Sequence, residues 1–106
     1  MTASAKANEK WARQRFQRAA EQCRTAMEPH LKKMETDEGV LAMLLVSGIA
    51  QLVALGHESP AALTYTVKQA SILSGIPEAA LDAQARFSSE MLTCFEFDQQ
   101  QNKSSR

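Results

Sequence analysis

The sequence predicts an all-α fold, a compact bundle of about four helices that pairs into a dimer. Good helix formers such as Ala, Leu, Glu, Gln, Lys and Arg dominate the 106 residues, and only three prolines and four glycines interrupt them. The chain lacks the alternating β-branched and aromatic runs that a sheet would need. Because a chain of this length supports one core, we expect a single helical domain over 1–98 and a disordered tail over 99–106.

The first helix is predicted by a stripe of small and apolar side chains, about 100° wide, over residues 5–34. Pro29 interrupts this stripe, because proline lacks a backbone donor and clashes with the preceding turn. We therefore expect a kink or short break near Glu28. The stripe consists of Ala5, Ala12, Phe16, Ala19, Ala20, Cys23, Met27, His30 and Met34.

Trp11, the only tryptophan, falls on the outer side of this helix with Arg15, Arg18 and Gln22. Exposed Trp beside Arg is enriched in protein-binding hot spots, because both bury much area and arginine pairs bidentately with carboxylates. We expect these four residues to bind a partner protein. The alternative is that Trp11 folds back onto another helix or lies in a frayed end.

A second helix is predicted over 40–55, with capping side chains in Thr36, Asp37 and Glu38 and a stop at Gly56. Its circumference is apolar apart from a strip of Ser47 and Gln51, so we expect it at the centre of the core. The apolar run is about 16 residues, short of the ~20 that a membrane span needs. Its richest face is the expected homodimer interface. That face carries Leu41, Leu45, Leu52 and Leu55.

The second half of the chain begins with Ser59 and Pro60, which predict the N-cap and first residue of a short helical turn. Thr66 and Gln69 predict a capping box, and hence a separate short helix over 67–74 that ends at Gly75. Pro77 then begins a final helix that runs to about residue 97. We expect it to be a surface helix with one inward apolar stripe.

The segment 65–81 resembles the helix-turn-helix of excisionase-like and MerR-like DNA-binding proteins. Small Ser71, turn residue Gly75 and apolar Ile76 and Leu81 occupy the positions that fix such a turn. The resemblance implies that the start of the second helix reads DNA. That surface has a formal charge of −1, and its carboxylates would repel phosphates, so DNA is the less favoured partner. It comprises Glu78, Ala79, Asp82, Ala83 and Arg86.

Charge is distributed unevenly along a chain whose formal net charge is zero. Residues 1–33 hold eight Lys and Arg against three Glu, or +5, and residues 34–106 hold four against nine acidic residues, or −5. Such asymmetry fits either a nucleic-acid arm or complementary surfaces within the fold or across a dimer.

Catalytic signatures are missing from the sequence: there is no nucleophile elbow, phosphate loop, dinucleotide turn or zinc spacing. We therefore expect a protein that is not an enzyme and takes no cofactor or metal. Cys23, Met27 and His30 share a helix stripe that could hold a soft metal, but packing accounts for them. Cys23 and Cys94 have no redox spacing and the N-terminus has no signal peptide, which predicts free thiols and a cytoplasmic location.

In size and layout, this small, neutral, helical chain with one very apolar helix and a basic first helix resembles the bacterial quorum-sensing antiactivators of the QslA type from Pseudomonas. The resemblance implies dimeric assembly and sequestration of a LuxR-type transcriptional activator, and it carries over no functional residue. We therefore expect a protein-binding regulator that inhibits or sequesters a partner. The competing classes are a helix-turn-helix DNA-binding regulator and a structural subunit of a larger assembly.

Overall fold

The protein is all-α, as predicted, and its described residues contain no strand. The computed structural model describes the backbone of residues 2–104 and the side chains of residues 9–95. The bundle measures 48 × 28 × 19 Å. Its elements are α1 (Thr2–Met27), a 3-10 helix η1 (Glu28–His30), α2 (Leu31–Met34), α3 (Asp37–Ala54), α4 (Pro60–Ser74) and α5 (Glu78–Ser104).

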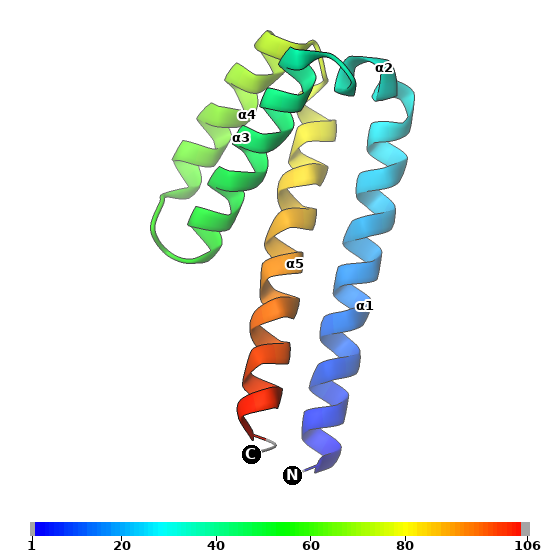
Figure 1. Cartoon of the computed structure of the whole chain (residues 1–106), viewed down its shortest axis with the longest axis vertical. Coiled ribbons are helices and arrows are strands. Elements are labelled where there is room, and N and C mark those ends of the chain that lie inside the picture. The colour runs from blue at the N-terminus through cyan, green and yellow to red at the C-terminus, as the bar shows by residue number, and fades with distance from the viewer. Residues whose placement is uncertain (1, 105–106) are drawn as a thin grey trace.

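The centre of the bundle is α5. It runs antiparallel to α1 along one side, while α3 and α4 form a hairpin that packs against its first half (Figure 1). The prediction that α3 lies at the centre is therefore wrong. It rested on the nearly all-round apolar surface of this helix, whereas the packing follows where small side chains let helices approach. The last helix has the predicted inward stripe, because Leu81 and Ala85 are buried while Asp82 is exposed.

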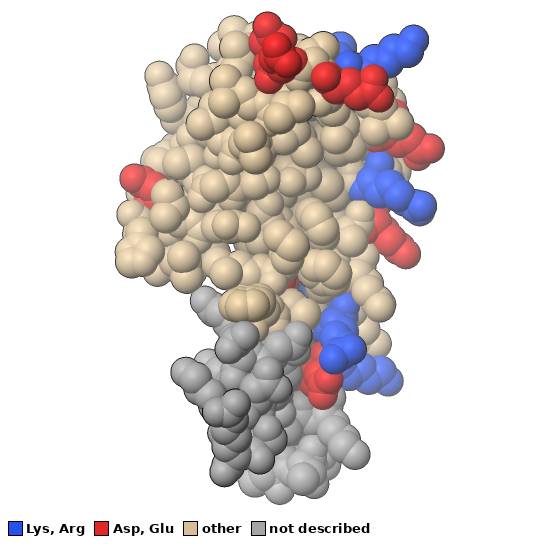
Figure 2. Space-filling model, viewed as in Figure 1, with Lys and Arg blue, Asp and Glu red and all other residues tan. Residues whose placement is uncertain are grey.

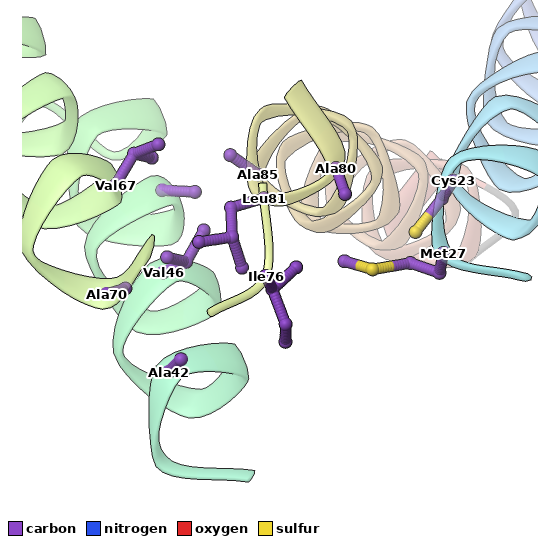
Figure 3. Close-up of a cluster of buried hydrophobic side chains, with 11 residues drawn as sticks. Cys23, Met27, Ala42, Val46, Val67, Ala70, Ile76, Ala80, Leu81 and Ala85 are labelled. Atoms are coloured by element: carbon purple, nitrogen blue, oxygen red, sulfur yellow. The ribbon is translucent and has the colours of Figure 1, made fainter. Parts of the chain in front are cut away.

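The core is built mainly from small side chains. Seven of the 13 buried apolar residues are alanines, which allow closely spaced helix axes. Ile76 and Leu81 are fully buried and meet Val46 on the hairpin side of α5, while Cys23 and Met27 approach α5 from α1 on the other side (Figure 3). The alanines are Ala12, Ala19, Ala42, Ala50, Ala70, Ala80 and Ala85.

The first helical region has the predicted stripe and the predicted break. Ala12, Ala19, Cys23 and Met27 are buried, and the Phe16 ring lies 5.5 Å from that of Phe87, between centroids. The helix ends at Met27, and η1, which contains Pro29, leads into α2. Ala5 lies outside the described side chains.

The predicted caps of α3 and α4 are confirmed. Thr36 Oγ1 accepts a hydrogen bond from the Gly39 backbone N–H at 3.0 Å, and Ser59 Oγ accepts one from that of Ala62 at 3.3 Å. Gly56 and Gly75 both have positive φ, 81° and 77°, which only glycine adopts without strain.

The separate short helix predicted over 67–74 is wrong, because α4 is continuous from Pro60 to Ser74. Thr66 does not cap a helix: its hydroxyl donates to the Ala62 carbonyl at 2.8 Å, one turn back within α4.

At its other end, α5 extends to Ser104, beyond the predicted end near residue 97. The segment 99–104, where we expect a disordered tail, is thus helical, and its Gln and Lys residues are good helix formers. Residues 105 and 106 lie outside the described part of the chain.

Among the described residues, one helix, α3, has the length and composition that crossing a membrane would require. This is weak evidence for a membrane span, because core helices meet the same criteria. In this bundle α3 packs against α4 and α5 on one side.

The turn between α2 and α3 requires a glycine at position 39. A Cβ atom added there would lie 1.9 Å from the Lys33 carbonyl oxygen and 2.9 Å from the Met34 Cα, both of which are backbone atoms. Neither atom can move without shifting α2. Lys33 also joins this region to the α4–α5 turn, because its Nζ donates to the Gly75 carbonyl at 3.0 Å.

We predict that Gly39→Ala lowers the free energy of unfolding by about 3 kcal/mol, the upper part of the range for overpacking, because backbone must be displaced. Urea denaturation followed by circular dichroism measures it. Glu38→Ala is the control: Glu38 is exposed in the same turn, and loss of its charge at the helix start should cost less than ~1 kcal/mol. Equal effects of the two changes would show that α2 tolerates the displacement.

Candidate protein-interaction surfaces

The first candidate surface lies along α1 and α5 and contains all four residues predicted to bind a partner. Trp11 is 54% exposed, as its position on the outer side of the helix predicts. The Arg15 guanidinium carbon lies 4.8 Å from the centre of the Trp11 ring, in cation–π contact, and this guanidinium also forms an ion pair with Glu90 of α5. Arg15 therefore orients the tryptophan and joins the two long helices.

Next to this pair is a hollow of about 230 Å³. Arg86 Nη1 donates to Gln22 Oε1 at 3.2 Å along its edge, and Arg18 lies beside it without an ion pair among the described side chains. Three arginines and one glutamate give the lining a formal charge of +2. The lining residues are Arg15, Arg18, Ala19, Gln22, Arg86 and Glu90.

This surface includes two residues that sequence reasoning did not place there. Glu90 and Arg86 lie 75 and 64 residues from their α1 partners Arg15 and Gln22, so no local pattern could have revealed these pairs. Arg15 and Gln22 also hold the fold together, because each bonds a side chain of α5. Trp11 and Arg18 are the two predicted residues whose described contacts do not link α1 to α5.

The helix-turn-helix-like segment has the internal packing that its sequence predicts. Gly75 adopts positive φ, Ile76 and Leu81 are fully buried, and Ser71 Oγ donates to the Ile76 carbonyl at 2.7 Å. Its expected DNA-reading face is only partly free, however, because Arg86 donates to Gln22 of α1. Glu78 and Asp82 remain exposed at the beginning of α5, where they would meet phosphates.

The second candidate surface is the outer side of the α3–α4 hairpin, which we call the apolar face. All four residues of the predicted dimer interface are exposed there. The hairpin side is almost free of charged side chains in Figure 2, whereas these gather along the α1 side. Nine large apolar side chains are at least 40% exposed on it: Val40, Leu41, Leu44, Leu45 and Leu52 from α3, its C-cap residue Leu55, and Tyr65, Ile72 and Leu73 from α4.

A third feature is a cleft of about 490 Å³ between α1, α2 and α5, lined by Met27, Leu31 and Phe87 among others. Burial raises the pKa of the Cys23 thiol at its floor, which keeps the thiol protonated and unreactive. Cys23 Sγ donates to Gln84 Oε1 at 3.1 Å, and Gln84 Nε2 donates to Ser47 Oγ at 2.9 Å. The thiol thus belongs to a polar link across α1, α5 and α3. Both cysteines are free, as predicted.

The described residues hold no group of three or more His, Cys, Asp or Glu side chains placed to share a metal ion. Cys23, Met27 and His30, which share a stripe in the sequence, are separated by the helix break: Cys23 and Met27 are buried, whereas His30 lies in η1.

Comparisons with protein families, curated proteins and solved structures find no match for this chain.

We predict different roles for Arg15 and Arg18 in stability. Arg15→Ala leaves the Glu90 carboxylate, whose side chain is only 14% exposed, without its partner, so it should lower the free energy of unfolding by about 1–2 kcal/mol. Arg18→Ala removes no such pair and should change it by less than ~0.5 kcal/mol. Thermal and urea denaturation of both variants measure this, and a stability loss for Arg18→Ala as large as that for Arg15→Ala would contradict the assignment.

Proposed function

We propose that the protein is a non-enzymatic protein-binding regulator that associates with and sequesters a partner protein, such as a transcriptional activator. The observation that carries this proposal is the α1–α5 surface, where exposed Trp11 lies next to a hollow lined by three arginines. Trp and Arg are the residues most enriched at the energetic centres of protein interfaces.

The chemistry of the hollow favours an acidic segment of the partner. Among the described side chains, Arg15 is the only one of these three arginines with a carboxylate partner, and Arg18 and Arg86 leave donors facing the hollow. Guanidinium groups pair with carboxylates in bidentate geometry, and the neighbouring indole ring offers apolar area to the side chains beside them. A segment with two acidic residues next to an apolar or aromatic one fits this arrangement.

Two of the three arginines of this surface already have partners on the neighbouring long helix. The Arg15–Glu90 ion pair and the Arg86–Gln22 hydrogen bond restrict two of the three arginines. Less side-chain entropy is then lost when the partner binds. The same pairs hold α1 against α5, so the surface depends on the closed bundle.

Partner capture is tested with the wild-type chain, Trp11→Ala and Arg18→Ala as baits in lysate of the native host, followed by titration with the purified captured protein. Both changes should weaken binding at least tenfold, or about 1.4 kcal/mol, because each removes part of the interface without removing a tie between α1 and α5. Wild-type binding can be followed by the fluorescence of Trp11, the only tryptophan. Affinity should fall as salt rises, because the contact pairs arginines with carboxylates.

Arg13→Ala is the matched control. Arg13 is another exposed arginine of α1, but it pairs with Glu9 at 2.8 Å and does not line the hollow, so partner affinity should be unchanged. An equal loss for Arg13→Ala would indicate a non-specific charge effect. If the chain instead binds duplex DNA selectively and salt-sensitively, and Arg86→Ala abolishes this, the DNA-binding alternative is correct.

A further inference from the structure

The apolar face of α3 and α4 is larger than a monomer normally exposes. With roughly 200 Å² for a fully exposed large side chain, its nine residues leave on the order of 900 Å² uncovered, against about 300–600 Å² for the largest apolar patch of a typical monomer. A standard protein–protein interface covers about 800 Å² on each partner. This face is therefore large enough to form one complete interface.

The exposed residues of α3 are arranged symmetrically about Gly48. On a helix of 3.6 residues per turn, Gly48 lies opposite the buried stripe of Ala42, Val46 and Ala50. Leucines stand seven residues away on both sides, at Leu41 and Leu55. Others stand three residues before and four residues after it, at Leu45 and Leu52.

We propose that this face binds a second copy of the chain, with the two α3 helices antiparallel and related by a two-fold axis at Gly48. In that register Leu41 packs against the partner's Leu55, and Leu45 against the partner's Leu52. The two Gly48 residues meet on the axis, where the absence of side chains lets the backbones approach. A Cβ at Gly48 would have no heavy atom within 4 Å inside one chain, so this space is open to a partner.

The same axis brings the two α4 helices together. A groove of about 240 Å³ between α3 and α4 is lined by Leu45 and Ile49 on one side and by Tyr65, Gln69 and Leu73 on the other. Gln69 lies midway between Tyr65 and Leu73, as Gly48 does between the leucines of α3. The antiparallel arrangement therefore places Tyr65 near the partner's Leu73, and the two hairpins form a four-helix bundle.

A second copy fits this face better than a membrane or a charged partner does. No Asp, Glu, Lys or Arg occurs from Gly39 to Leu55, and Lys68 is the only one in α4, so a charged partner would find almost no counter-charge. Helices that lie on anionic membranes carry Lys and Arg along their polar edge, whereas α3 begins with Asp37 and Glu38 and is followed by Glu58. An isologous interface needs no other complementary surface, because each chain supplies the same leucines.

Light scattering coupled to size-exclusion chromatography tests the association. The wild-type chain should be a dimer at micromolar concentrations. Leu45→Glu places a carboxylate against the partner's Leu52 and should raise the dimer dissociation constant at least a hundredfold. Gly48→Gln should raise it at least tenfold by separating the helices. It should also raise the melting temperature of the monomer, because glutamine is a better helix former than glycine.

Disulfide trapping tests the register. In a Cys23→Ala, Cys94→Ala background, Leu41→Cys and Leu55→Cys should cross-link poorly when each is oxidised alone and efficiently when mixed in equal amounts. A disulfide needs Cα atoms within about 7 Å. Of these two positions, the antiparallel register brings 41 close to the partner's 55, and it keeps each position far from its own copy. Gly48→Cys, which lies on the axis, should cross-link alone.

A wild-type chain that stays monomeric at 100 micromolar with intact helicity would overturn the proposal. So would efficient cross-linking of Leu41→Cys alone, which indicates parallel helices, or a monomer that binds anionic vesicles through Leu45. The inference goes beyond the proposed partner capture and does not depend on it. Trp11→Ala should leave the dimer intact, so the two proposals can fail separately.

Discussion

The structure depends on the close approach of helices that meet through alanine. Most of the buried apolar side chains are small, and none of the five leucines between positions 41 and 55 is buried. In most small domains the larger apolar side chains supply the core, because the free energy of burial grows with the area removed from water. Here α5 fits between α1 and the hairpin only because Ala80 and Ala85 leave room for both neighbours. Most of the larger apolar side chains of the α3–α4 hairpin remain on the outside.

This arrangement divides the chain into two halves with different surface chemistry. The long α1–α5 pair carries almost all of the arginines and exchanges polar contacts between its helices, as in Arg15–Glu90 and Arg86–Gln22. The α3–α4 hairpin is nearly uncharged and exposes a large apolar surface. Gln84 connects the halves, since it bonds Cys23 of α1 and Ser47 of α3 from its place on α5. Polar and apolar surfaces therefore lie on different sides of one small bundle.

Local signals in the sequence were sufficient for the helices and most of their ends. Thr36, Ser59, Gly56 and Gly75 act through neighbouring backbone atoms, so their roles can be recognised without a structure. Thr66 could not be judged in this way, because Thr-x-x-Gln is as compatible with a helix interior as with a cap. The order of the helices in space was also missed, since apolar periodicity identifies an inward face but does not distinguish an alanine contact from a leucine contact. The pairing of Arg15 with Glu90 depends on the path of the whole chain.

The shape of the subunit determines where the two copies of the proposed dimer would point. The hairpin covers only the first half of α5, and α1 and α5 continue past it as a two-helix stem (Figure 1). A two-fold axis through the hairpins directs the stems of the two subunits in opposite directions. The assembly would then be bivalent, with one arginine-lined hollow on each subunit. A partner that is itself a dimer could engage both hollows only if its acidic segments match the distance between them, in which case the second contact would benefit from a high effective concentration. The distance between the hollows would thus select among partners that carry the same binding segment.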